Sequence, residues 1–383
     1  SYADYSRDGA YVKLDDLLPV AVPKLYNSIS DADWDGVKIN GEIYAVPDLK
    51  QSYSGANHLI YREDLRQKYG TPPITDMRTA ELFFDAIKKN EPSMYPVQTK
   101  GDAWVNDLFT YMVGKANPDS AWNAAFIPQS QLLFLDFANP YSDMKAPWEL
   151  PEYREFLQTM RRWAQKGFWS EDILSEKNPS QDLVEAGKSA AGGAGMNVDK
   201  VQKYIERIRE NTPSWDVSEF SWDQARGFSI PAASQQDMST IPLQSKHPEK
   251  GLQVIEGFLM DKDLQFLVHY GIDGVHYEVT PENQYKQLPG SKNYGIFAMN
   301  GWGWKNEGLL LPQIGGWGAE HFAYYKLFDS IAVPNFGFAV DRDSINAEMT
   351  ALKQVEEQYG WPLWSGLVDD VDEGSQILQQ KLA

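Results

Sequence analysis

The sequence contains no cysteine, and histidine is scarce. Without thiols, the chain can form no disulfide bond, no zinc–thiolate site and no cysteine nucleophile. The histidines are scattered, without the spacing of a zinc site or a sign of a His-based triad: His58, His247, His269, His276 and His321. The stretches "GGAG" and "GWGWKNEG" match neither the dinucleotide-binding nor the P-loop template. We therefore expect no metal, no cofactor and no nucleotide.

Long apolar runs and positive charge are also in short supply. No stretch of about eighteen apolar residues occurs, so we expect no membrane-spanning helix. The chain carries 35 Lys and Arg against 54 Asp and Glu, a formal net charge of −19. This charge repels phosphate groups, which argues against nucleic acids and anionic membrane surfaces as partners.

Aromatic residues are abundant, with 13 Trp, 20 Tyr and 17 Phe in 383 residues. A chain of this length can bury a large core and form two lobes. Aromatic rings fill such cores, but Trp at this density also suits partly wet binding surfaces on which sugar rings stack. The composition therefore directs attention to carbohydrate.

The patterning predicts strands that alternate with helices, which indicates an α/β fold. Asn40-Gly41 lies between two alternating stretches and predicts a tight β-hairpin. Strands are also expected at 9–13, 58–62, 189–197 and 227–233, and helices at 14–18, 63–70, 75–90, 150–168, 179–187, 198–211, 247–271, 345–360 and 372–383. We find no internal repeat, and we expect the chain to cross between lobes several times.

The segment "DADWDGVKINGE", residues 31–42, matches the ligand positions of a calcium-binding loop. Two features disfavour a calcium site. The next residues, "IYAVP", cannot begin the second helix that a calcium hand requires, and a tight turn at Asn40-Gly41 pairs Glu42 with Ile39, away from any ion. We interpret the segment as a solvated acidic loop followed by a hairpin, with Trp34 as a hydrophobic plug.

Several motifs occur in a characteristic order. They are "WDGVKINGEIYAVP" followed by "LIYREDLRQKYG", then "LVEAGKSAAGGAGMN", then residues 247–279, and finally "FGFAVDRDSINAEMTALKQV". This ordered set resembles the extracellular solute-binding proteins (family 1) of carbohydrate ABC importers, and its last part resembles lipoproteins of the LipO and aldouronate type. The resemblance covers nearly the whole chain.

The resemblance implies a two-lobed, periplasmic-binding-protein-like fold of type II with a ligand cleft between the lobes. Lobe one would comprise 1–56 and 236–312, and lobe two 57–235 and 313–383. Such a bacterial protein is not an enzyme. It binds an oligosaccharide and delivers it to the permease subunits of its importer, as a monomer held at the extracellular surface by a lipid anchor. Relative to this family, we expect that the sequence lacks an N-terminal segment with the signal peptide and anchor, and a last helix.

The resemblance also implies where ligand-binding residues lie. The loop after the hairpin supplies Asp48, Tyr53 and Asn57. Trp104 lies near the start of a lobe-two helix. Asn197 lies at the carboxyl end of a predicted strand of small residues, and ligands of open α/β sheets gather at such ends. Each of these residues has an alternative role in the core or on the solvated surface.

Three further tryptophans, Trp302, Trp304 and Trp317, adjoin glycines, which lie on both sides of Trp302 and Trp317 and directly before Trp304. This setting is poor for a strand or helix core and suits a loop that presents a ring to a ligand. The alternative is that they are core residues, as we expect of Trp163 and Trp169.

The sequence leaves the sugar and the reaction class open. Lys50, Arg62 and Arg226 either meet a uronate carboxylate or form ion pairs within the protein. The alternative function is a secreted glycoside hydrolase acting with a carboxylate pair about 5–10 Å apart. An eightfold strand–helix repeat, which would favour a barrel-type hydrolase, is missing from the sequence.

Overall fold

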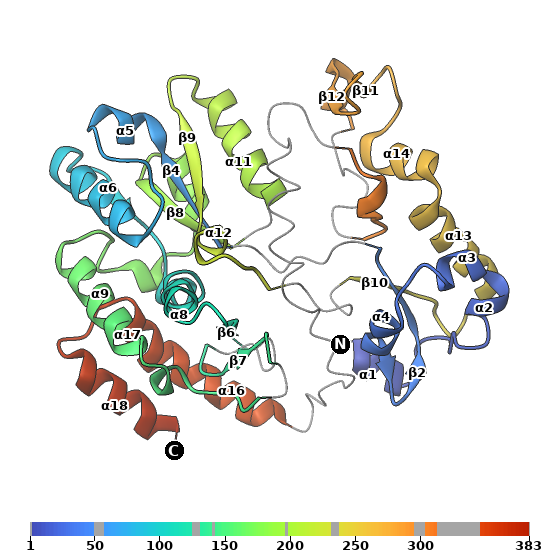
Figure 1. Ribbon diagram of the computed structural model, residues 1–383, viewed down its shortest axis with the longest axis horizontal. Coiled ribbons are helices and arrows are strands. Elements are labelled where there is room, and N and C mark those ends of the chain that lie inside the picture. Colours follow the sequence, from blue (N-terminus) through green and yellow to red (C-terminus); the bar gives the residue numbers. More distant parts are fainter. Residues whose placement is uncertain are drawn as a thin grey trace. The chain divides into compact units, whose positions relative to one another are not determined.

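The computed structural model describes residues 2–49, 57–124, 131–139, 142–195, 198–230, 237–294, 303–311 and 345–382. The chain divides into two compact units (Figure 1). Unit 1 comprises Ser1–Ser52, Pro231–Tyr325 and Val333–Ser344, and unit 2 comprises Tyr53–Ile230, Lys326–Ala332 and Ile345–Ala383. Each unit therefore combines segments that are distant in the sequence. Predicted residues Lys50, Tyr53, Asn197, Trp302 and Trp317 lie outside the described residues.

Unit 1 is built from short helices and three two-stranded ladders. Its helices are α1 (Tyr2–Arg7), α2 (Leu18–Ala21), α3 (Pro23–Tyr26), α4 (Asp31–Gly36), α13 (Pro248–Met260), α14 (Lys262–Tyr270), and the 3-10 turns η4 (Pro289–Lys292) and η5 (Glu307–Leu309). Its strands are β1 (Lys38–Ile39) with β2 (Glu42–Ile43), β3 (Ala45–Pro47) with β10 (Met238–Thr240), and β11 (Tyr277–Val279) with β12 (Tyr285–Gln287).

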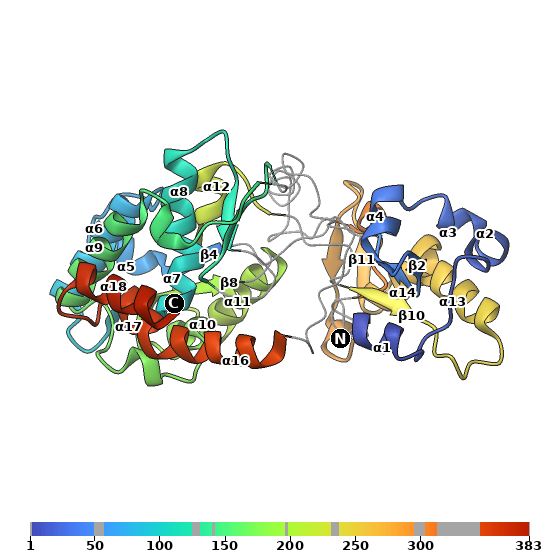
Figure 2. The same ribbon diagram turned by 90° about the horizontal axis from the view of Figure 1, so that it is seen from below.

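The core of unit 1 joins the start of the chain to residues some 230 positions later. Helices α2 and α3 pack against α13 (Figure 2). Leu18 and Leu25 from the first segment meet Leu252 and Ile255 from α13, all of them buried. The predicted helical region 247–271 is two helices, because Asp261 ends α13 and caps α14 by accepting hydrogen bonds from the backbone N–H groups of Asp263 and Leu264.

The segment with the calcium-loop pattern folds in another way. Residues 31–36 form helix α4, capped by Ser30, so the acidic stretch is helical and not the loop that we expected. The hairpin is confirmed, with Ile39 opposite Glu42 and positive φ at Asn40 and Gly41. No group of acidic residues among the described ranges is arranged to hold a metal ion.

Trp34 is the predicted plug. Its side chain is 4% exposed, and its indole N–H donates to the Tyr26 carbonyl over 3.2 Å. It packs in the unit 1 core with Val37 and Ile43, which anchors the helix and the hairpin to one another.

Unit 2 contains a four-stranded sheet in the order β5-β8-β4-β9. The strands are β5 (Tyr95–Val97), β8 (Ser189–Gly195), β4 (Asn57–Arg62) and β9 (Val217–Ser221). Strand β8 is parallel to β5 and antiparallel to β4, which is also antiparallel to β9. The carboxyl ends of β5, β8 and β9 therefore share an edge of the sheet with the amino end of β4, which we call the carboxyl edge.

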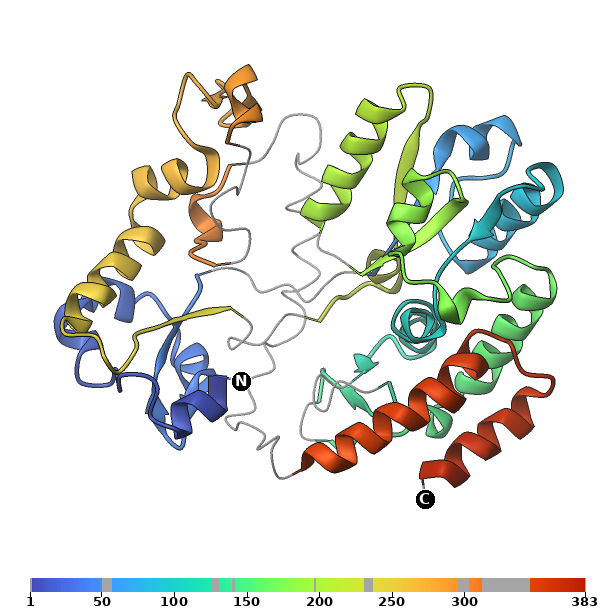
Figure 3. The same cartoon turned by 180° about the vertical axis from the view of Figure 1, so that it is seen from behind.

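Helices cover both faces of this sheet. The α-helices of unit 2 are α5 (Glu63–Lys68), α6 (Met77–Asn90), α7 (Gly101–Trp104), α8 (Thr110–Ala116), α9 (Tyr153–Gln165), α10 (Ser180–Glu185), α11 (Val198–Asn211), α12 (Trp222–Arg226), α16 (Asn346–Val355), α17 (Trp361–Trp364) and α18 (Val371–Leu382). Unit 2 also contains the 3-10 helices η2 (Pro147–Glu149) and η3 (Ile173–Ser175) and the π-helical segments η1 (Val105–Phe109) and η7 (Glu356–Gly360). A separate two-stranded ladder pairs β6 (Trp122–Ala124) with β7 (Phe134–Asp136). Helix α11 packs on one face through Val201, Ile205 and Ile208, while α9, α16 and α18 lie together in the layer beyond the other (Figure 3).

Local sequence signals set the boundaries of these helices. Asp76 caps α6 near the start of the helix predicted at 75–90, and its carboxylate and the Thr79 hydroxyl form a capping box. Gly70 ends the α5 turn with φ of +65°. The strand expected at 227–233 is wrong for 227–230, since the Phe228 carbonyl accepts a hydrogen bond from Arg226 Nε instead of pairing with a strand. The strand expected at 9–13 is reduced to one bridge, between Tyr11 and Pro242.

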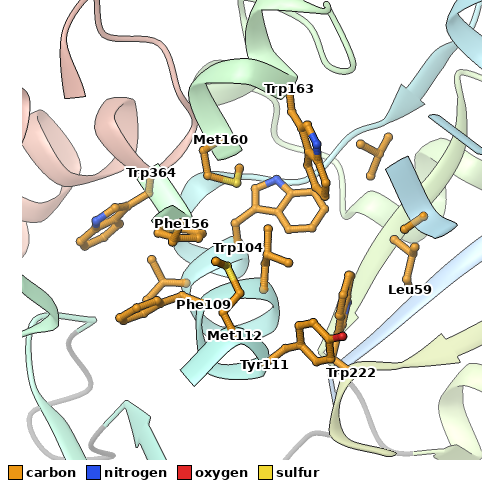
Figure 4. Close-up of a cluster of buried hydrophobic side chains, with 14 of the residues drawn as sticks. Leu59, Trp104, Phe109, Tyr111, Met112, Phe156, Met160, Trp163, Trp222 and Trp364 are labelled. Atoms are coloured by element: carbon orange, nitrogen blue, oxygen red, sulfur yellow. The ribbon is translucent and has the colours of Figure 1, made fainter. Parts of the chain in front are cut away.

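Most of the unusual aromatic content of unit 2 fills its core (Figure 4). Trp104 packs against Trp163 with ring centroids 5.7 Å apart and against Trp169 at 6.0 Å. Phe109 and Phe156 continue the cluster at 5.3 Å. The Trp104–Trp163 pair is edge-to-face and the other two pairs are tilted. Aromatic contacts of this kind add to the hydrophobic gain from burial, so the cluster fixes how α7 and α9 pack together. Among the described residues, no helix has the length and apolar character needed to cross a membrane.

Candidate functional site

Trp304 of unit 1 has an unusual backbone conformation. Its φ is +59°, in the left-handed region that non-glycine residues avoid at a cost of roughly 1–2 kcal/mol. Its indole stacks on Phe258 of α13, with centroids 4.8 Å apart and planes 9° from parallel. The residue remains partly exposed. Backbone strain of this kind persists where the surroundings enforce it, and it often marks a functional position.

Two buried side chains of α14 hold the Trp304 carbonyl. Gln265 Nε2 donates to this oxygen over 2.5 Å, and His269 Nε2 donates to it over 3.1 Å. Gln265 is 1% exposed and His269 is 0% exposed. They are four residues apart, so they lie on one face of the helix. Burial lowers the pKa of His269 from 6.5 to about 4, which keeps the ring neutral at ordinary pH.

The same group of side chains satisfies the end of α13. The last carbonyls of a helix lack partners within it. Here the Phe258 carbonyl accepts from Gln265 Nε2, and the Leu259 carbonyl accepts from Asn306 Nδ2 over 2.8 Å. The backbone N–H of Asn306 in turn donates a hydrogen bond to Gln265 Oε1 over 3.4 Å. The segment that carries Trp304 is therefore fastened to the corner between α13 and α14.

Asp48 contacts the same segment from the other side of the sequence. Its Oδ1 accepts a hydrogen bond from the Trp304 backbone N–H over 3.2 Å. The neighbouring Leu49 forms a parallel β-bridge with Asn306. Two residues that the sequence analysis selected independently, Asp48 and Trp304, are thus brought together within unit 1. The contact gives Asp48 a role in holding Trp304.

The other selected residues of unit 2 have different surroundings. Trp104 is 0% exposed and belongs to the aromatic core, so in this structure its ring presents no surface to a ligand. Trp163 and Trp169 are buried in the same cluster, as expected. Asn57 is the first residue of β4 and pairs with Gly195, which places it at the carboxyl edge of the sheet.

Two of the three selected cations are occupied within unit 2. Arg62 pairs with Asp64 through two hydrogen bonds of 2.8 and 2.7 Å, and its guanidinium lies 3.7 Å from the centre of the Trp215 ring. Arg226 is buried beside Asp223 at 2.8 Å. These contacts favour the ion-pair interpretation over contact with a ligand carboxylate for both arginines.

Sequence reasoning missed Gln265, His269 and Phe258 as parts of the site. The spacing of Gln265 and His269 at i and i+4 was visible, but polar residues at this spacing usually form a solvated helix face. Only the fold shows that this face is buried against the 303–306 segment.

Comparison with known proteins adds to this geometry. A family model described as a domain of unknown function (DUF3502) matches residues 334–383. A protein of Streptococcus pneumoniae serotype 4 named carbohydrate ABC transporter substrate-binding protein is 22% identical over 392 residues, which span 100% of this chain and 74% of that protein.

Solved structures match over the whole chain as well. The N-glycan transport solute-binding protein NgtS from Streptococcus pneumoniae superimposes with a TM-score of 0.76 at 20% identity, covering 100% of this chain and 80% of that one. An extracellular solute-binding protein from Bifidobacterium longum subsp. infantis superimposes with a TM-score of 0.59 at 14% identity, covering 100% of this chain and 82% of that one.

These matches define the class: the chain has the α/β fold of the solute-binding proteins. The predicted resemblance to solute-binding proteins of carbohydrate ABC importers is confirmed by the named relative and by the solved structures. The comparisons give no support to the alternative of a glycoside hydrolase.

Proposed function

We propose that this protein binds an oligosaccharide and delivers it to the permease of an ABC importer. The observation that carries the proposal is the presentation of Trp304, whose ring is backed by Phe258 and whose strained backbone is held by buried polar groups. Flat, partly exposed aromatic rings supply the apolar faces on which sugar rings stack. The whole-chain similarity to carbohydrate-binding relatives supports the same assignment.

Preorganisation explains the strain at Trp304. A ring that is already fixed loses little conformational freedom when the ligand binds, so more of the contact energy contributes to affinity. In the ligand-free protein, hydrogen bonds from Gln265 and His269 to the Trp304 carbonyl offset the free-energy cost of the left-handed backbone conformation. Trp304 is therefore the ligand contact in our proposal, and Asp48 holds it in place.

The ligand class follows from the relatives. Structures of NgtS include complexes with Man1GlcNAc and Man5GlcNAc. Our proposal extends oligosaccharide binding to this chain without choosing the sugar. It also assigns the protein no catalysis, a monomeric state and an extracellular location with a lipid anchor. Units 1 and 2 correspond in this proposal to the two predicted lobes.

The test is a titration of the protein with a panel of neutral and acidic oligosaccharides, Man1GlcNAc among them. Tryptophan fluorescence and calorimetry report binding, and reducing ends are assayed in the same samples. We expect saturable binding of at least one member without new reducing ends. New reducing ends would contradict the receptor assignment and restore the hydrolase.

A pair of variants tests the role of Trp304. We expect Trp304→Leu to weaken binding about tenfold or more, since base- or sugar-sized rings stacked on an aromatic side chain contribute roughly 1–3 kcal/mol. The matched control is Trp215→Leu, a partly exposed tryptophan that stacks on Arg62 near the sheet edge opposite the carboxyl edge. Equal affinities of the two variants would contradict the assignment of Trp304.

A further inference from the structure

A pocket of about 260 Å³ opens in unit 2, beside the carboxyl end of β5. It is slightly smaller than the roughly 300–1,000 Å³ of pockets that enclose drug-sized ligands, so it suits a single ring. Its polar lining comes from the segment between β5 and α7, from the loop before α10 and from the first residue of α10: Gln98, Lys100, Glu176, Lys177, Asn178 and Ser180. None of these residues belongs to the Trp304 site.

The position of the pocket is set by a parallel strand pair. Gln98 extends β5 by donating its backbone N–H to the Ala191 carbonyl of β8 over 3.3 Å. Gly192 of β8 allows α10 to approach closely, because a Cβ there would lie 2.7 Å from the Ser180 carbonyl oxygen. Ligands of open α/β sheets bind outside the carboxyl ends of strands, and the pocket lies at such an end.

Gln98 provides a donor of fixed orientation to this pocket. It is only 6% exposed, and its Oε1 accepts a hydrogen bond from the Ser170 backbone N–H over 3.1 Å. This contact fixes the orientation of the amide. Within the described ranges of the chain, no residue accepts a hydrogen bond from its Nε2. This amide N–H group is therefore available to donate to an oxygen of a bound ligand.

The charges in the pocket do not cancel. Glu176 accepts from the backbone N–H groups of Lys177 and Asn178 at 2.8 and 2.9 Å and from Asn178 Nδ2 at 2.7 Å. The hydrogen bond from Asn178 lowers the pKa of Glu176, so this carboxylate is ionised and engaged with its own loop. Lys100 and Lys177 have no carboxylate within ion-pair distance among the residues that the structure describes. Two cations against one anion leave a positive pocket in a chain of net charge −19.

We propose that this pocket binds a sugar residue that carries a carboxylate, with Lys100 and Lys177 contacting the carboxylate and Gln98 Nε2 contacting a ring or hydroxyl oxygen. Ammonium groups bind carboxylates through charge-assisted hydrogen bonds, which are roughly twice as strong as neutral ones. The proposal rests on the proposed function, since it names an acidic sugar as one unit of the ligand. In this proposal Lys100 and Lys177 take the role of binding a uronate carboxylate, since Arg62 and Arg226 are paired with carboxylates of the protein.

The first experiment uses the smallest probes that contain the chemistry. Methyl β-D-glucuronide and its neutral counterpart, methyl β-D-glucoside, are titrated into the full chain at low ionic strength and followed by ligand-observed NMR and calorimetry. We expect saturable binding of the glucuronide, at least about tenfold tighter than the glucoside and weakened by added salt. Failure of the glucuronide to bind more tightly than the glucoside would overturn the proposal.

Variants locate the binding. Lys100→Met combined with Lys177→Met should abolish the preference for the glucuronide, while Lys100→Arg, which keeps the charge, should retain most of it. The control is Lys115→Met, an exposed lysine in the last turn of α8 that should leave the preference unchanged. A preference that survives in the double variant would place the acidic sugar elsewhere. Equal binding of methyl β-D-glucoside 6-sulfate would contradict the assignment to carboxylates.

The outcome is separate from that of the proposed function. If neutral oligosaccharides bind but the glucuronide shows no preference, the importer assignment stands and the pocket assignment fails. If the glucuronide binds at Lys100 and Lys177 but no oligosaccharide of the panel binds, the pocket stands and the oligosaccharide assignment fails.

Discussion

Acidification should weaken unit 1 through a single buried side chain, His269. Its pKa is lowered by burial from 6.5 to about 4, and the positive charge of Lys305 acts in the same direction. The His269 imidazole therefore binds a proton more tightly in the unfolded chain than in the folded chain. Stability from this group is present above pH 6.5 and is lost as the pH falls toward 4.

The magnitude follows from the shift. A difference of about 2.5 pKa units corresponds to about 3 kcal/mol over the whole range, and the part lost between pH 7 and pH 5 is about 2 kcal/mol. The range from pH 7 to pH 5 isolates His269, because carboxylates such as Glu81, whose pKa is lowered to about 2, lose their contribution to stability only at lower pH. The loss should appear at the Trp304 carbonyl, the acceptor of His269 Nε2.

Urea unfolding at pH 7 and pH 5, followed by hydrogen exchange in α14, measures unit 1 separately from unit 2. The comparison is with His269→Gln, which can donate a hydrogen bond but does not titrate. We expect the variant to lose about 2 kcal/mol less than the native chain between the two pH values. The control is His247→Gln, at an exposed position. Equal losses in the native chain and His269→Gln would refute the reasoning.

Three further predictions concern packing and metal. Trp104→Ala should destabilise unit 2 by about 3–5 kcal/mol. Trp104→Phe should cost only roughly 1–2 kcal/mol, because the indole N–H that it removes has no acceptor among the described residues, and it should leave the sugar affinity unchanged. Gly366→Ala should cost about 2 kcal/mol or more in thermal unfolding, since φ is +66° and the new Cβ would lie 2.3 Å from the Met160 carbonyl; Gly9→Ala, with φ of +72° and open space, should cost only about 1 kcal/mol. Calcium should leave the melting temperature unchanged, and a rise would restore the calcium interpretation of residues 31–42.

Local signals in the sequence were sufficient for elements whose boundaries are chemically marked. The Asn40-Gly41 turn, the Asp76 cap and the Gly70 stop each specify a backbone conformation through nearby atoms alone. The strand at 227–233 failed because the Phe228 carbonyl is taken by the side chain of Arg226, a contact that no periodicity reveals. The acidic stretch 31–36 became a helix because Ser30 caps it, a signal that the calcium pattern concealed.

The tryptophans show the limit for the site. Trp104 and Trp304 were selected on equal terms, yet Trp104 is surrounded by the rings of Trp163 and Trp169 while Trp304 is held in a strained, partly exposed position. Gly303, directly before Trp304 in a glycine-rich stretch, was the useful signal, because it indicated a loop and not a core element. Residues such as Gln265 that act on the backbone of another segment have no such signal, since their partners are about forty positions away.

Arg226 and Lys100 allow an experiment to distinguish a cation that stabilises the fold from a cation that binds a ligand. Arg226 lies in the core with its guanidinium 2.8 Å from Asp223, so Arg226→Met removes the cation from a buried carboxylate and should cost about 3–5 kcal/mol of unit 2 stability. Lys100 has no such partner among the described residues, so Lys100→Met should leave the melting temperature within a degree or two and weaken only acidic ligands. Thermal unfolding and glucuronide titration of both variants separate a structural cation from a binding cation. If Lys100→Met proves the more destabilising, the lysine is part of the fold and the pocket needs another donor.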